Sequence, residues 1–303
     1  MTESLQATAS RRESRPHAFA WMAASACGFG LMNFCGHVAG ERIHWSMTAA
    51  TRCLVGAAVA YAVARSRGAT LRVRDRRGIW WRCLWGTLSM ILTFYALGTR
   101  LPLGDTVTLT NLSPVFLALT APVLLGERTG KRVVVALALS VAGVVLVVRP
   151  EMFAGADALK GAGAAIASAL SASFSYTMLR RMGTAESPEA VTLHFSLVAA
   201  AVLTAIAALH LAVPDGRTLA MMLGAGASGG FAQIALTRAY ALERAARVGG
   251  VSYLAVVVSA VLGAVALHEW PTTRTVLGMT LVVAGGLVVT MVGVREALRT
   301  GRG

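Results

Sequence analysis

The chain has 303 residues, of which 56% are apolar and only 14% are charged, and its formal net charge at pH 7 is +14. A soluble domain usually carries about 25% charged residues, because its surface needs polar groups. The composition therefore argues against a soluble enzyme and favours a polytopic membrane protein. Nucleic acid is not expected as a partner, because the basic residues lie in short clusters between long apolar runs.

The apolar runs predict ten transmembrane helices, since each crossing needs about 20 apolar residues. The predicted spans are 18–40, 46–64, 79–99, 104–125, 133–148, 159–179, 190–211, 218–241, 248–267 and 275–294. Residues 1–17 are polar and basic and lack the apolar core of a secretory signal, so we interpret them as a cytoplasmic tail. Residues 295–303 form a second tail, and the short connections leave no room for a soluble domain.

The basic residues predict the orientation of these spans. Cytoplasmic segments of membrane proteins carry an excess of arginine and lysine. Ten spans with the N-terminus inside place most of the 28 basic residues on the cytoplasmic side. We therefore expect a multi-pass protein of the plasma (bacterial inner) membrane, surrounded by lipids, with both termini in the cytoplasm.

The chain contains an internal repeat. A shift of 142 positions aligns 123–147 with 265–289 and pairs Glu127 with Glu269 and Arg132 with Arg274. The repeat divides the membrane region into residues 18–149 and residues 150–294. Because each repeat holds five spans, an odd number, the second copy must insert upside down. The predicted fold is an all-α membrane protein of ten transmembrane helices in two inverted five-helix repeats, an arrangement typical of secondary transporters.

Motifs in the first repeat carry a family resemblance. They read FYAL at 94–97, LPLGD at 101–105, LSPVF at 112–116, LLGER at 124–128 and AGV at 142–144. This series resembles the EamA branch of the drug/metabolite transporter superfamily. The resemblance implies a permease whose central cavity lies among the first, third, fourth, sixth, eighth and ninth spans. The ninth span lacks a counterpart of Pro114, so we expect the two halves to bend unequally.

Polar and aromatic side chains near the middle of those six spans are candidates for substrate contact. Serine in a membrane helix often bonds a carbonyl of its own helix, and asparagine or glutamine can join helices, so a structural role stays open for each. The candidate substrate-binding residues are Asn33, Trp85, Ser89, Tyr95, Asn111, Tyr176, Gln233 and Tyr253.

Arg52 and His194 are the ionisable residues farthest inside the predicted spans. Arg52 either extends its charge to the outer surface or anchors a carboxylate or phosphate. His194 either lies at the membrane interface or couples transport to protons. The four cysteines form no CxxC pair and have no histidine at metal-ligand spacing, so neither a metal site nor a cofactor is expected.

The acidic residues bear on the mechanism, because none of the fourteen lies in the middle of a predicted span. Facilitated diffusion or exchange is therefore expected, rather than proton antiport through a membrane carboxylate. We expect Glu127 and Glu269, at helix ends, either to pair with Arg132 or Arg274 or to fix the membrane boundary. A cavity with arginine and without acids suits a carboxylate, so an amino-acid-like metabolite is the first candidate. Cationic or aromatic drugs are the alternative, held by cation–π attraction.

Two other function classes compete with transport: an intramembrane enzyme and a structural or receptor-like membrane protein, and the inverted repeat argues against the latter. An intramembrane lipid-modifying enzyme would need a catalytic constellation, and the spans hold no HxxxD, no HExxH and no pair of mid-depth aspartates, so no catalytic residue is expected.

Small residues such as Gly143 and Gly285 either let helices pack closely or form a homodimer contact.

Overall fold

The computed structural model describes residues 2–125, 131–147, 156–242 and 249–299, and within these ranges it is helical and holds no strand. The helices of the first half are α1 (Thr2–Gly40), α2 (Trp45–Arg67), α3 (Arg76–Leu97), α4 (Leu103–Thr110), α5 (Ser113–Leu125) and α6 (Lys131–Val147). Those of the second half are α8 (Ala156–Met182), α9 (Pro188–Ala207), α10 (Gly216–Leu242), α12 (Leu254–Leu267) and α13 (Thr273–Arg299). Three short 3-10 helices join them: η1 (Gly183–Ala185), η2 (Ala208–His210) and η3 (Gly249–Tyr253).

Each of the ten predicted spans coincides with helical structure, α4 and α5 sharing the fourth span and η3 and α12 sharing the ninth. Among the described residues, five helices are long and apolar enough to cross a membrane on their own: α1, α2, α8, α9 and α10. The helix α1 begins at Thr2, ahead of the predicted span, and its apolar part is His17–Gly40.

The fourth and ninth spans are both interrupted, at equivalent positions of the two repeats. Asn111 ends α4, and α5 starts two residues later with Pro114 in its first turn, where a missing N–H costs no hydrogen bond. In the second repeat η3 gives way to α12 at Tyr253, which aligns with Asn111. The second interruption has no proline, so a proline is not required for the helix to break at this position of the repeat.

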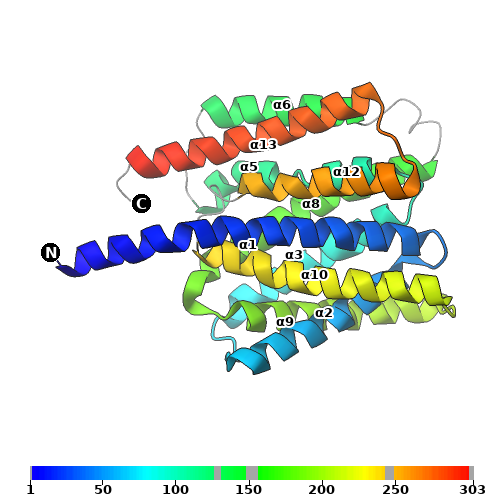
Figure 1. Ribbon diagram of the computed structural model, residues 1–303, viewed down its shortest axis with the longest axis horizontal. Helices are drawn as coiled ribbons and strands as arrows, with labels where there is room; N and C mark the ends of the chain where they lie inside the picture. Colours follow the sequence, from blue (N-terminus) through cyan, green and yellow to red (C-terminus); the bar gives the residue numbers. More distant parts are fainter. Residues whose placement is uncertain (1, 126–130, 148–155, 243–248, 300–303) are drawn as a thin grey trace.

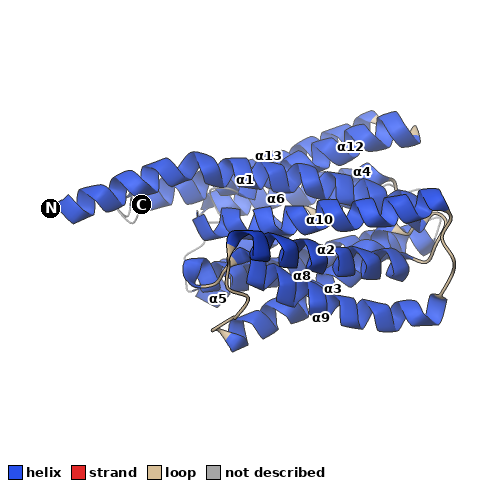
Figure 2. Cartoon of the chain, turned by 60° about the horizontal axis from the view of Figure 1, so that its bottom comes forward, coloured by secondary structure: helices blue, strands red, loops and turns tan. Residues whose placement is uncertain are grey.

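The helices lie side by side along one long axis, and both chain ends lie at the same end of the bundle (Figures 1 and 2). We call this the N-terminal end and the opposite one the far end. In Figure 1, α1 runs through the centre, with α6 and α13 on one side and α2 and α9 on the other. The counterpart of α1 in the second repeat, α8, runs the opposite way. Its early residue Gly161 contacts Thr99 just after α3, whereas its later residue Ser175 bonds Arg82 near the start of α3.

Glycines allow two helix pairs to touch through their backbones. A Cβ atom added at Gly230 of α10 would lie 2.9 Å from the Cα of Gly56 in α2. One added at Gly143 of α6 would lie 2.7 Å from the carbonyl oxygen of Gly278 in α13. Water does not drive helices together inside a bilayer, so such close van der Waals contacts carry much of the association.

Glu269 ties the two repeats together at the far end. Its carboxylate accepts a hydrogen bond from the N–H of Leu103 at 2.8 Å and lies 3.2 Å from Nε2 of His37. The other ring nitrogen of His37 faces the carbonyl of Leu97 at 2.9 Å. The expected pairing with Arg274 is wrong, because that guanidinium reaches the carbonyl of Val145 instead. Glu127 lies outside the described residues.

The Gly230 contact predicts a stability difference between two alanine variants. Gly163→Ala serves as the control, because Gly163 is a helical glycine with no atom within 4 Å of an added Cβ. Both substitutions favour the helix by about 1 kcal/mol, but Gly230→Ala forces α10 away from α2, at a cost of about 1–3 kcal/mol. In detergent, Gly230→Ala should therefore melt below Gly163→Ala, and equal melting temperatures would contradict the contact.

The Glu269 contacts predict a pH-dependent contribution to stability. Burial by itself raises the pKa of Glu269, but the hydrogen bonds from His37 and Leu103 and the charge of His37 outweigh it and lower the pKa. A lowered carboxyl pKa stabilises the fold above the ordinary pKa of 4.5, and this contribution is lost as the pH falls from there through the lowered pKa. Glu269→Gln should lower the melting temperature by about 2–4 °C at pH 7. The difference should shrink steadily as the pH falls below 4.5, and a difference independent of pH would refute this role.

Candidate functional site

A cavity of about 120 Å³ lies inside the bundle, between the two repeats. Its wall is formed by α1, α3, the α4–α5 break, α8, α10 and the start of α12, with one residue from α9. These are the six spans that the family resemblance implies, with Phe195 of α9 in addition.

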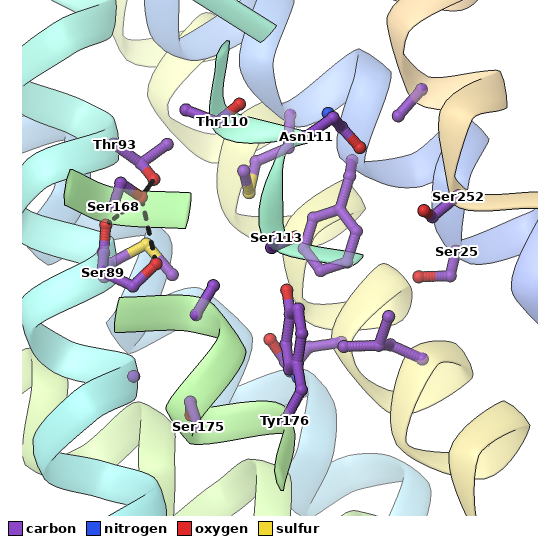
Figure 3. A pocket seen from close by; sticks show the side chains of 18 of the residues that line it. Ser25, Ser89, Thr93, Thr110, Asn111, Ser113, Ser168, Ser175, Tyr176 and Ser252 are labelled. Atoms are coloured by element: carbon purple, nitrogen blue, oxygen red, sulfur yellow. Dashed lines mark hydrogen bonds between the residues drawn. The ribbon is translucent and has the colours of Figure 1, made fainter. Parts of the chain in front are cut away.

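Hydroxyl groups line the side of the cavity formed by α3 and α8 (Figure 3). The hydroxyl of Ser168 lies 2.6 Å from that of Thr93 and 3.1 Å from that of Ser89, and it donates to the Ser89 carbonyl at 3.0 Å. These three side chains bond each other, so this part of the wall is polar and satisfied within the protein.

The opposite side of the cavity carries polar atoms that the protein leaves without partners. Oδ1 of Asn33 and Nε2 of Gln233 are buried and make no hydrogen bond within the described part of the chain. Asn111 also lines the cavity, at the break between α4 and α5, and its amide nitrogen donates to the Val107 carbonyl at 2.9 Å. Buried polar atoms are nearly always bonded, so unpaired ones on a cavity wall need an explanation.

Of the eight candidate contacts, five line the cavity: Asn33, Ser89, Asn111, Tyr176 and Gln233. The other three lie outside its wall. Trp85 packs against the ring of Phe174, with the ring centroids 4.7 Å apart, and Tyr95 meets the edge of Trp45 at 5.9 Å. Tyr253 is buried in an apolar cluster, and its hydroxyl has no partner. A role in binding stays a prediction for all eight residues.

Arg52 is fully buried, so its charge does not extend to the membrane surface. Its Nη2 donates to the Gly229 carbonyl at 3.3 Å, and its side chain lies behind the cavity wall. His194 lies near the N-terminal end of the bundle, where its Nδ1 faces the Ala190 carbonyl at 2.8 Å. It borders a separate surface hollow between α3 and α9. An anchoring or coupling role for either residue stays a prediction.

Arg82 is a cavity residue that was not predicted from the sequence. Basic residues near a predicted span end were assigned to the cytoplasmic side, but Arg82 is 2% exposed and lines the cavity. A signal was present, because Arg82 follows Trp80 and Trp81 along α3. Tryptophan prefers the membrane interface, so an arginine one step farther along the helix lies on the membrane side of it.

An ion pair joins α9 and α10 at the N-terminal end of the bundle. The carboxylate of Glu189 accepts a hydrogen bond from Arg238, and both side chains are largely buried. The guanidinium carbon of Arg238 also lies 4.8 Å from the ring centre of Trp21 in α1, within the range of cation–π attraction. Met22, the next residue of α1, lines the cavity. This ion pair therefore holds α1, α9 and α10 together close to the cavity.

Comparison with known proteins shows several relatives that are named as transporters. The chain is 27% identical over 233 residues to the pseudopaline exporter CntI of Pseudomonas aeruginosa, covering 77% of this chain and 81% of the exporter. It is 28% identical to human solute carrier family 35 member G1 over 67% of this chain and 59% of that protein. A crystal structure with 22% identity aligns with a TM-score of 0.67 over 90% of this chain and 98% of that one, which supports the fold.

The model of the EamA-like transporter family matches the chain twice, at residues 17–149 and 159–291. The two matches confirm that the ten helical spans form two five-helix repeats. They cover most of the sequence, and the relatives named as transporters agree with them. The chain therefore belongs to the EamA-like transporter family, within the drug/metabolite transporter superfamily.

Proposed function

We propose that the chain is a secondary transporter that moves a small polar organic metabolite, amino-acid-like in its chemistry, across the plasma membrane by alternating access. The polar cavity between the two repeats carries this proposal. Its described lining residues offer unpaired hydrogen-bonding atoms on Asn33 and Gln233 and include no carboxylate. The arginine distribution supports an orientation with both termini in the cytoplasm.

The unpaired atoms favour a polar solute over an apolar one. A buried polar atom without a partner costs about 1–3 kcal/mol, and a solute that supplies the missing hydrogen bond offsets this cost. Asn33 presents an acceptor and Gln233 a donor, so a solute with both kinds of group complements the wall. At about 120 Å³ the cavity holds a small solute, and a larger one requires the helices of its wall to move apart.

Polar contacts lie toward both ends of the bundle, and alternating access requires contacts of this kind to break and re-form. His37 and Glu269 join the repeats at the far end, and Glu189 and Arg238 join α9 to α10 at the N-terminal end. In the proposed cycle one set breaks while the other stays formed. The relative named as an exporter supports outward movement of the solute. Because the described cavity wall holds no carboxylate, exchange or facilitated diffusion is proposed rather than proton antiport.

Export of cationic or aromatic drugs is the second candidate. The rings of Tyr176 and Tyr240, with centroids 5.6 Å apart, line the cavity and offer aromatic faces to such a solute. The guanidinium of Arg82 lies on the same wall, however, and repels a cation. The metabolite is therefore preferred over a cationic drug.

Two substitutions in the cavity test the proposed function. A thermal-shift screen of amino acids and related metabolites on the purified protein first selects a solute. Counterflow of that solute is then measured in proteoliposomes. Tyr176→Ala and Asn111→Ala should each reduce counterflow at least about tenfold, because each removes a side chain from the cavity wall.

Tyr61→Ala is the matched control for Tyr176→Ala, because Tyr61 is 51% exposed on the outer face of α2. It should leave counterflow unchanged. Wild-type counterflow in both cavity variants, at equal amounts of folded protein, would show that the solute does not pass through this cavity.

A further inference from the structure

Arg82 is a buried cation on the cavity wall, and the described residues supply no anion for it. Its Nη1 donates to the hydroxyl of Ser175 at 2.6 Å, whereas its Nε is buried and has no partner among them. No described carboxylate lies within ion-pair distance of its guanidinium. A guanidinium has five N–H donors and Ser175 accepts from one nitrogen only, so donors remain for a solute.

A second buried cation lies close to the first. The guanidinium carbon of Arg82 is 4.3 Å from the ring centre of Phe195, and that of Arg52 is 5.9 Å from the same ring. Arg52 and Phe195 are both buried, and only Phe195 reaches the cavity. Two positive charges thus share one aromatic ring, and Arg52 adds to the positive field at Arg82 without touching the cavity itself.

Gly86 fixes where the Arg82 guanidinium lies. A Cβ atom at this position would collide with Nη1 of Arg82 and would lie 2.8 Å from the Phe195 ring. The arginine side chain therefore extends along α3 over the face that Gly86 leaves open, toward the middle of the bundle. Gly86 and Phe195 act as positioning residues for the guanidinium.

An unpaired cation in a membrane protein interior destabilises the fold, because it has lost its hydration. A carboxylate offsets that loss through short charge-assisted hydrogen bonds, which arginine often makes in pairs. We propose that Arg82 binds the carboxylate group of the transported solute. Arg52, which lies near the same Phe195 ring, adds to the positive potential at Arg82. This inference rests on the proposed function and names its substrate class, a small carboxylate.

The position of Arg82 sets the orientation of the bound solute. Arg82 lies near the start of α3, toward the N-terminal end of the bundle, whereas Asn33 and Asn111 line the cavity nearer the far end. The carboxylate thus points toward the N-terminal end, and the polar remainder of the solute lies among the amides.

The test uses the purified full-length protein in detergent, with acetate, glycine and glycinamide as probes. Melting temperatures are measured against sodium chloride at equal ionic strength. Acetate and glycine should raise the melting temperature of the wild type, and glycinamide, which lacks the carboxylate, should not. Arg82→Gln should raise the acetate concentration for a half-maximal shift at least about tenfold. Gly86→Ala keeps the charge of Arg82 but displaces the guanidinium, so it should also raise the acetate concentration for a half-maximal shift.

Arg67→Gln is the matched control, because it removes an exposed arginine and should leave the acetate response unchanged. An acetate shift of equal size in Arg82→Gln and in the wild type would overturn the proposal, as would a wild-type response to glycinamide alone. Without any probe, Arg82→Gln should melt at or above the wild-type temperature, because it removes an unpaired buried charge. A large loss of stability in that variant would instead indicate a structural arginine and refute the proposal.

The two proposals fail in different ways. If acetate binds through Arg82 but no carboxylate shows counterflow in proteoliposomes, the site stands and the proposed transport function fails. If a solute without a carboxylate shows counterflow that Arg82→Gln leaves intact, the transport function stands and the assignment of Arg82 fails.

Discussion

Hydrocarbon offers no hydrogen-bond partner, and this constraint governs the whole molecule. It forces the described backbone into helices, which bond their own N–H and C=O groups. It also restricts where a helix can stop inside the membrane. The breaks at Asn111 and Tyr253 occur within the bundle, and the wall of the cavity includes Asn111 and Ser252 beside them. The irregular backbone at both breaks therefore lies beside the cavity.

The contacts that hold the bundle together fall into two kinds. Helix pairs such as α2 with α10 and α6 with α13 meet at glycines and leave no space between their backbones. Toward the ends of the bundle a few polar side chains make the second kind of contact, His37 with Glu269 and Glu189 with Arg238. Each of these polar contacts joins only a few atoms, whereas the interlocked helices touch along their backbones. In the proposed transport cycle, tight helix pairs therefore move as units while polar contacts break and re-form.

The sequence was sufficient for the fold because its signals are long and repeated. The apolar runs of about 20 residues give the spans, and the alignment of Glu127 with Glu269 gives the repeat. Because each repeat holds an odd number of spans, two inverted halves follow without knowledge of any contact. The ninth span shows the limit of local signals, since it breaks at Tyr253 without the proline that marks the fourth.

The candidate site was harder to predict, because the depth of a residue along a helix does not give the direction of its side chain. Asn33, Asn111 and Gln233 face the cavity, whereas Trp85 and Tyr95 lie at similar depths and turn toward Phe174 and Trp45. Arg82 was missed for a related reason. Its place near the start of α3 suggested a surface charge, but Gly86 opens a path along the helix for its side chain. The space above Gly86 is seen only once the neighbouring helices are in place, so the sequence alone does not reveal it.

The central claim is that the cavity opens alternately to the two sides of the membrane. A variant without the four native cysteines, carrying Ser89→Cys on the cavity wall, tests it with a membrane-impermeant thiol reagent. The reagent is applied to right-side-out and to inside-out vesicles. Alternating access predicts labelling in both preparations, and protection from labelling by the transported solute. Labelling from one side only, with and without solute, would contradict the account.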